Sequence, residues 1–215
     1  VRHRLNEDGL MLVEVPDAAR YQAFPVFDFY WIGQVEHINH FDEVHLRLLL
    51  SRHGFVEVES KQHHVRIAPN VVNPLIQALF RRGPKSPTAR SEGSGDLRGA
   101  VHNYLVEQEK RMAQQRRRFQ RLCTRQCPVY VWGIGLEFFC LYHLGELRSC
   151  HIAGLVDNNP AKQKKTVEGR RITPQEVLRD APANAAIVLT SALHGDAMAS
   201  WLSSIGFVGE IVRIA

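Results

Sequence analysis

The stretch VYVWGIGLEFFCLYHL, residues 129–144, decides the fold of the last part of this chain. Its first four residues are apolar and predict a short buried strand. Gly133 and Gly135 follow and predict a tight turn, after which the residues through Leu147 predict a helix. Between a strand and a helix, glycines let the backbone approach an anion, and the helix N-terminus offers N–H groups and a favourable dipole. We therefore expect a phosphate-type group to bind at this turn.

Strands and helices alternate from this stretch to the end of the chain. Strands are predicted at 152–156, 186–189 and 210–214, and helices from a capping box at 173–176 and over about 195–205. Such alternation is typical of a parallel sheet whose strands are joined by right-handed helical crossovers. We therefore expect residues 128–215 to form a Rossmann-like nucleotide-binding domain.

Polar side chains follow the second strand of this domain. Asp157 ends that strand roughly twenty residues after Gly135, where dinucleotide-binding folds place an acid that binds ribose. Asn158 and Lys162 add an amide and a cation, while Phe138 stands where a third glycine is usual. The candidate substrate-binding residues are thus Gly133, Gly135, Asp157, Asn158 and Lys162. A solvated loop, or a domain of this fold that has lost its ligand, is the alternative.

The first region, residues 1–82, reads as the end of another α/β domain. Residues 10–15 are nearly all apolar, which is typical of a strand inside a covered sheet. This strand suggests that the sequence is a C-terminal fragment of a longer protein. Residues 16–41 predict a long, aromatic-rich irregular segment, either contacting substrate or covering the core as a lid.

Short sequence patterns predict further helices and strands up to about residue 80. Asp42 predicts the N-cap of a helix that runs through His53. Residues 55–59 alternate like a strand, and residues 64–67 predict its hairpin partner. A short apolar helix is predicted at 71–80.

A polar segment separates the two folded regions. Residues 81–95 have almost no apolar content and predict a mobile loop or linker. Residues 97–122 predict one long, polar helix that links two bodies, so we divide the chain into 1–82, 83–127 and 128–215. Basic residues gather in this helix, but without interleaved aromatic residues they favour a solvated face over a nucleic-acid surface.

Glu36 and His37 are the candidate catalytic pair. A carboxylate beside an imidazole can move protons, because histidine titrates near neutral pH. His37 could instead join His40 and His45 in a metal site, but no standard zinc spacing is present, and we expect no metal. A capping or packing role is the other alternative.

The composition is that of an ordinary globular protein. The formal charge is +5, with 45% hydrophobic and 23% charged residues. No apolar run approaches the roughly 20 residues that span a bilayer, and the first residues do not read as a secretory signal. We expect a cytoplasmic protein that binds neither membrane nor nucleic acid. Its four cysteines fit reduced thiols.

Several motifs, taken in order, resemble a known family. Residues 5–17 (LNEDGLMLVEVPD) and 36–41 (EHINHF), the latter followed by a helix and Gly54-Phe55, are similar to late motifs of class I S-adenosylmethionine-dependent methyltransferases. The glycine turn, residues 156–163 (VDNNPAKQ) and residues 169–172 (GRRI) resemble the C-terminal domain of sugar-nucleotide C-methyltransferases.

The resemblance implies an α/β fold with a partial class I methyltransferase sheet, a long helix and a small Rossmann-like parallel-sheet domain. The parent protein would methylate a nucleotide-linked sugar or a related small acceptor, with Glu36 or His37 positioning or deprotonating it. S-adenosylmethionine would bind in the N-terminal half of that parent, because the first region here lacks the glycine-rich cofactor loop. We therefore expect this chain alone to be inactive, and its long helix could form a homodimer.

Two other classes of protein also fit the sequence. The first is a non-catalytic nucleotide-sugar-binding or assembly module with a Rossmann-like fold. The second, a nicotinamide-dependent oxidoreductase, is disfavoured by the missing third glycine and by the small size of the domain.

Overall fold

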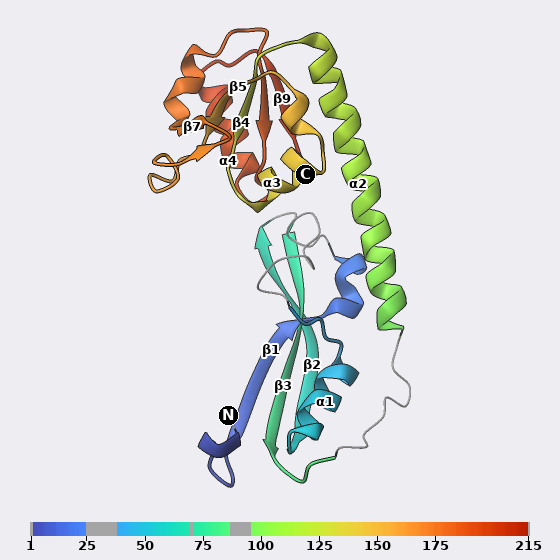
Figure 1. Cartoon of the computed structure of the whole chain (residues 1–215). Coiled ribbons are helices and arrows are strands. Elements are labelled where there is room, and N and C mark those ends of the chain that lie inside the picture. Colours follow the sequence, from blue (N-terminus) through green and yellow to red (C-terminus); the bar gives the residue numbers. More distant parts are fainter. Residues whose placement is uncertain (1, 25–37, 69–70, 87–95, 215) are drawn as a thin grey trace. The chain divides into compact units, whose positions relative to one another are not determined.

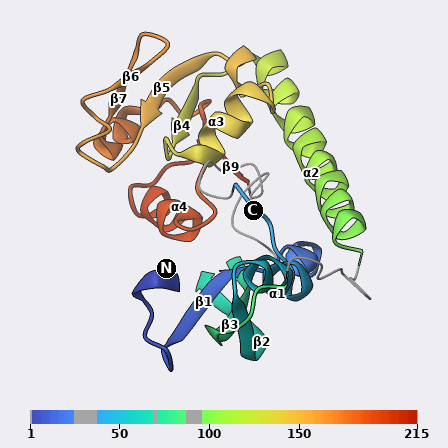
Figure 2. The ribbon, with the colours of Figure 1, turned by 60° about the horizontal axis from the view of Figure 1, so that its bottom comes forward.

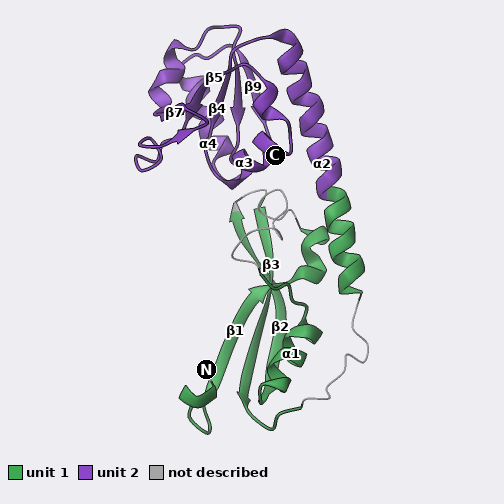
Figure 3. Cartoon of the chain, viewed as in Figure 1, with its two compact units in different colours: residues 1–107 green, residues 108–215 purple. Residues whose placement is uncertain are grey.

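The chain folds into two compact units, residues 1–107 and 108–215, which are described separately (Figures 1 and 3). The computed structural model describes residues 2–24, 38–68, 71–86 and 96–214. Within these residues, no helix is both long and apolar enough to cross a membrane.

Unit 1 is built on an antiparallel sheet whose strand order is β1-β3-β2. Its strands are β1 (Leu10–Pro16), β2 (Phe55–Ala68) and β3 (Val71–Arg82), and its helices are η1 (Arg2–Arg4), η2 (Ala18–Ala23) and α1 (Glu43–Arg52). Leu46 of α1 packs with Phe55, Ile76 and Phe80 of the sheet in one buried cluster. The helix therefore covers one face of the sheet.

Residues 71–80 form a strand, so the helix predicted there is wrong. Ile76, Ala78 and Phe80 are buried, and the residues between them are half-buried, which is the two-residue period of a strand. β3 pairs with β1 on one edge and with β2 on the other. This double pairing satisfies the backbone groups of an apolar run that could equally have formed a buried helix.

The hairpin predicted within residues 55–67 is also wrong. Both halves belong to the single strand β2, which has register irregularities between Glu57 and Glu59 and between Arg66 and Ala68. The hairpin partner of β2 is β3, which follows it after two residues outside the described ranges.

Among the described residues, β1 lies at an edge of its sheet rather than inside a covered one. Met11, Val13 and Val15 pack against the core, whereas Leu10 and Leu12 on the opposite face are 54% and 62% exposed. The expectation of an apolar strand covered on both faces is therefore wrong for the residues that the structure describes.

Unit 2 contains a six-stranded sheet with the order β6-β7-β5-β4-β8-β9. Its strands are β4 (Val129–Trp132), β5 (Ile152–Val156), β6 (Thr166–Val167), β7 (Arg170–Thr173), β8 (Ala186–Leu189) and β9 (Glu210–Arg213). All neighbouring pairs are parallel except β6 and β7, which form a hairpin at one edge. The predicted parallel α/β sheet is thus confirmed.

Helices cover the sheet of unit 2 on both sides. They are α3 (Leu136–His143), η4 (Leu147–Ser149), η5 (Gln175–Asp180) and α4 (Gly195–Ser204). Leu202 of α4 and Leu178 of η5 pack against Trp132 and Ile187 of the sheet. Figure 2 shows α3 and α4 on opposite sides of β4.

The capping box predicted at residues 173–176 does not form. The hydroxyl of Thr173 donates instead to the carbonyl of Leu155 at 3.0 Å, and Pro174 occupies the N-cap of η5 without a side-chain bond. Because Thr173 is the last residue of β7, its side chain is held by the neighbouring strand.

The long helix predicted in the middle of the chain is confirmed as α2 (Leu97–Arg125). The boundary between the units falls inside it, after Glu107. In unit 1, Tyr104 of this helix is buried against Tyr21, with ring centroids 5.5 Å apart. In unit 2, the buried residues of the helix include Met112, Phe119 and Leu122. Each part of α2 is therefore anchored in the core of its own unit.

Candidate functional site

The candidate site lies where the strands β4, β5 and β8 of unit 2 end. All three run parallel, so their carboxyl ends meet at one edge of the sheet. The chain proceeds from β4 to β5 and β7 on one side, and it returns to β8 and β9 on the other. Ligands of open α/β sheets bind at such a reversal of strand order.

Gly133 is fixed between the two strands that flank β4. Its φ of +107° favours glycine, and a Cβ added there would lie 3.3 Å from Oγ1 of Thr190. Its N–H donates to the carbonyl of Val156 at 2.8 Å, and its carbonyl accepts a bond from the Thr190 hydroxyl at 2.5 Å. The turn is therefore tied to both β5 and β8.

The amides of this turn have partners within the protein, contrary to the expectation that they face a ligand. The N–H of Ile134 donates to Oδ2 of Asp157 at 2.8 Å, and that of Gly135 donates to the carbonyl of Gly133 at 3.0 Å. Asp157 thus takes the place that we expected an anionic ligand to occupy.

The space for a ligand lies beside Gly135, the residue that follows Ile134 in the chain. This residue has an extended backbone and forms the N-cap of α3, without a side-chain bond to the helix. No atom lies within 4 Å of a Cβ added there, leaving aside its immediate chain neighbours. A helix start without a capping side chain favours a negatively charged group, because N–H groups and the helix dipole point toward it.

Asp157 organises this edge of the sheet. It is 7% exposed, and besides Ile134 its carboxylate accepts bonds from the N–H of Asn159 at 2.9 Å and from Nζ of Lys162 at 2.8 Å. Its backbone carbonyl also accepts a bond from the side-chain amide of Gln163 at 2.9 Å. The acid expected to bind ribose therefore holds the turn and the following loop in place.

Four of the five predicted binding residues come together at this edge. Gly133, Gly135, Asp157 and Lys162 are linked directly or through Ile134. Asn158 instead donates its side-chain amide to Oε1 of Gln175, at the start of η5, at 2.7 Å.

Glu137 and Thr190 belong to the site and were missed in the sequence. The carboxylate of Glu137, in the first turn of α3, accepts bonds from the N–H of Ala192 at 3.1 and 3.2 Å and thereby fixes the loop after β8. A charged residue inside the apolar stretch 136–142 was the available signal. Phe138, at the position of the absent third glycine, is fully buried and faces the core.

The predicted catalytic pair, Glu36 and His37, lies outside the described residues. Of the neighbouring histidines, His45 is bonded through Nδ1 to Oδ1 of Asp42 at 2.7 Å, and this oxygen also accepts the N–H of His45. The predicted N-cap at Asp42 is therefore confirmed. No cluster of three potential metal ligands occurs in the part of the chain that the structure describes.

A buried charge network at the end of β1 was not foreseen. Asp17 is completely buried and accepts bonds from Nε of Arg20 at 2.6 Å and from Nε2 of Gln62 at 2.8 Å. Arg20 also donates to the carbonyls of His63 and Leu75. This network joins all three strands of unit 1 at the point where the chain leaves β1.

Comparisons with known proteins identify no relative. No family model matches the chain, and a search of curated proteins finds no similar sequence. The resemblance to methyltransferases therefore depends on the order of the motifs.

Proposed function

We propose that unit 2 binds the nucleotide part of a nucleotide-linked sugar beside Gly135, within a protein that methylates that sugar. The observation that carries this proposal is the open, uncapped start of α3 at the reversal of strand order between β4 and β8. A phosphate there would meet the positive end of the helix dipole.

The groups around Gly135 suit a ligand that has both a charged part and uncharged polar groups. Lys162 supplies a cation whose side chain is 36% exposed, although Asp157 balances its charge. Glu137, in the first turn of α3, is held by the N–H of Ala192 and is 7% exposed. The fixed loops on both sides of the turn would add specificity through their backbone groups.

The methyl-transfer half of the proposal rests on unit 1. β1 is an edge strand among the described residues, and it exposes Leu10 and Leu12 on one face. A further strand of a longer sheet would pair with this edge, and further side chains would pack on this face. In the parent protein, Glu36 or His37 would position or deprotonate the acceptor.

The described residues of unit 1 do not fit S-adenosylmethionine. The chain leaving β1 enters the Asp17 network rather than a glycine-rich turn, and the carboxylate of Asp17 is fully engaged by protein groups. We therefore assign to this chain only the positioning or deprotonation of the acceptor by Glu36 or His37, and no other part of methyl transfer.

Calorimetry with UDP-glucose, as a representative nucleotide sugar, tests the binding half on the full chain. The variant G135V fills the space beside the helix, whereas the control A183V adds the same side chain in an exposed turn before β8, at the opposite edge of the sheet. We expect binding by the native chain and by A183V, and loss of binding in G135V. Equal binding by G135V would contradict the proposal.

A non-catalytic nucleotide-sugar-binding module is the second candidate. It is favoured by the lack of a cofactor-type glycine turn among the described residues of unit 1. Radiolabelled S-adenosylmethionine, offered with a nucleotide sugar to the full-length protein, separates the two candidates. Methyl transfer that falls in E36Q supports the enzyme, and binding without any transfer supports the module.

A further inference from the structure

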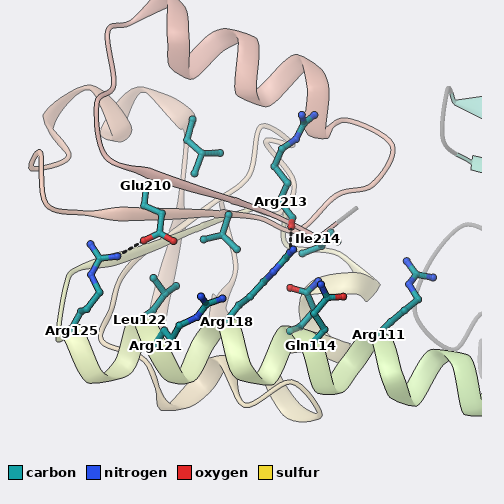
Figure 4. A pocket seen from close by; sticks show the side chains of 12 residues that line it. Arg111, Gln114, Arg118, Arg121, Leu122, Arg125, Glu210, Arg213 and Ile214 are labelled. Carbon is teal, nitrogen blue, oxygen red and sulfur yellow. Dashed lines mark hydrogen bonds and ion pairs between the residues drawn. The ribbon is translucent and has the colours of Figure 1, made fainter.

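A groove between α2 and β9 of unit 2 carries a concentrated positive charge. Its volume is about 550 Å³, and it is lined by residues of both elements (Figure 4). The charged residues that line it are Arg111, Arg118, Arg121, Arg125, Arg213 and Glu210, but the side chain of Arg213 points away from α2 toward Asp196 of α4. Four guanidinium groups thus lie with one carboxylate, that of Glu210, on the α2 side of β9.

The available carboxylates leave part of this charge unbalanced. Arg125 pairs with Glu210, and Arg213 pairs with Asp196. Arg118 donates through Nη1 to the backbone carbonyl of Arg213 at 2.9 Å, a bond that adds no negative charge. Within the described ranges, neither Arg118 nor Arg121 has an acidic partner.

The helix brings these arginines together on one face. Positions 118, 121 and 125 are separated by three and four residues, so their side chains lie on successive turns of the same side. In Figure 4, Arg121 lies along the helix between the Arg125–Glu210 link and the Arg118–Arg213 link. Like charges at this spacing destabilise a helix, and a bound anion would remove that repulsion.

The chemistry of the lining points to phosphate groups. A guanidinium group can donate two parallel hydrogen bonds to a phosphate, which makes arginine well suited to such ligands. The groove volume falls in the range of roughly 300–1,000 Å³ that is usual for small-molecule sites. The lining residues include no aromatic side chain on which a nucleobase could stack, which disfavours single-stranded nucleic acid.

A buried amide supplies a second feature of the groove. Gln115 lines it and is 4% exposed, yet its Oε1 has no hydrogen-bond partner in the described part of the chain. Buried acceptors are normally satisfied, whereas this oxygen is an unsatisfied acceptor in the wall of the groove.

We propose that this groove binds a small molecule bearing two or more phosphate groups, held by Arg118 and Arg121. The site is separate from the one beside Gly135, because none of its lining residues belongs to the glycine turn, to α3 or to the loop after β5. The inference therefore does not depend on the proposed function.

Calorimetry on the full chain with inorganic tripolyphosphate tests this inference. The double variant R118Q/R121Q removes the two arginines without acidic partners, and R98Q/R117Q removes the same charge from exposed positions of α2 outside the groove. We expect R118Q/R121Q to weaken binding at least about tenfold, because hydrogen bonds to charged groups are among the strongest that side chains make. The control variant should bind as the native chain does. The single variant R121Q, at a side chain without a bond to the rest of the described protein, provides the same test if the double variant does not fold.

Three results would overturn the inference. Equal weakening by R98Q/R117Q would show a response to net charge alone. Loss of tripolyphosphate binding in G135V, together with unchanged binding by R118Q/R121Q, would place the phosphates at the other site. Affinity for single-stranded oligonucleotides that rises with their length and exceeds that for tripolyphosphate would make the groove a nucleic-acid surface.

Discussion

The two glycines at the start of α3 are required for different physical reasons. Gly133 has a positive φ and is enclosed by Thr190 and Ser191, whereas Gly135 has an extended backbone and open space beside it. The backbone conformation of the turn requires a glycine at position 133. A glycine at position 135 is required only if a ligand approaches the backbone there.

Alanine at each position should therefore affect stability differently. We expect G133A to lower the free energy of unfolding by about 1–3 kcal/mol, the usual cost of a residue held in a disfavoured backbone conformation. G135A should leave it nearly unchanged, because an added Cβ meets no neighbour. Denaturant unfolding of both variants measures the difference, and equal losses would contradict the assigned turn geometry.

Cys150 should make the stability of unit 2 depend on pH. Its burial, followed by its contact with Cys123 at a sulfur separation of 2.8 Å, raises the pKa of the Cys150 thiol far above its ordinary value. In the unfolded chain this thiol ionises near pH 8.5. The contribution of this thiol to the free energy of unfolding is therefore complete below about pH 8.5, and it is lost as the pH rises above that value.

The variant C150A removes this titration. Between pH 8 and 10, the free energy of unfolding should fall less steeply in C150A than in the native chain. The same slope in both proteins would show that Cys150 does not remain protonated in the folded state.

At the scale of single elements, the N-cap at Asp42 was predicted correctly, whereas the strand at residues 71–80 was not. The cap at Asp42 involves residues only three positions apart, so the sequence contains all the information it needs. The strand state of residues 71–80 depends on pairing with β1, which lies some sixty residues away in the sequence. Thr173 was misread for the same reason, because its hydroxyl bonds to a neighbouring strand.

Truncation of neighbouring side chains in β3 distinguishes a strand from a helix. F80A should lower the free energy of unfolding by about 3–5 kcal/mol, since Phe80 is completely buried. L79A, on the half-buried opposite face, should cost about 1 kcal/mol. Similar large losses for both would favour the helix, in which Ile76, Leu79 and Phe80 share a face.

The cap of α1 gives a smaller, matched pair of variants. D42A removes the acceptor of the His45 N–H bond and should cost about 0.5–2 kcal/mol. D42N keeps an oxygen at the cap and should restore most of that loss. Thermal unfolding of both variants checks this, and equal stability of D42A and D42N would show that the cap contributes little.

For the whole molecule, the sequence predicted unit 2 better than unit 1. The alternation of strands and helices after residue 128 is repeated often enough to define a parallel sheet. In the candidate site, the sequence identified the glycine turn and Asp157. It could not reveal that Asp157 bonds to the turn itself, because that depends on how β4 and β5 align.

The chain as a whole should not bind S-adenosylmethionine tightly. Among the described residues, unit 1 offers no glycine-rich turn after a strand, and the acid at the end of β1 is engaged by Arg20 and Gln62. Calorimetry should therefore detect no tight binding, and submicromolar affinity would overturn this view of unit 1.

Backbone amide NMR of the full chain during titration with UDP-glucose tests whether a ligand binds beside Gly135. We expect the largest changes in chemical shift at Gly135 and in the first turn of α3, with smaller ones at residues 190–192. Changes confined to other residues, or no changes at millimolar ligand, would contradict it.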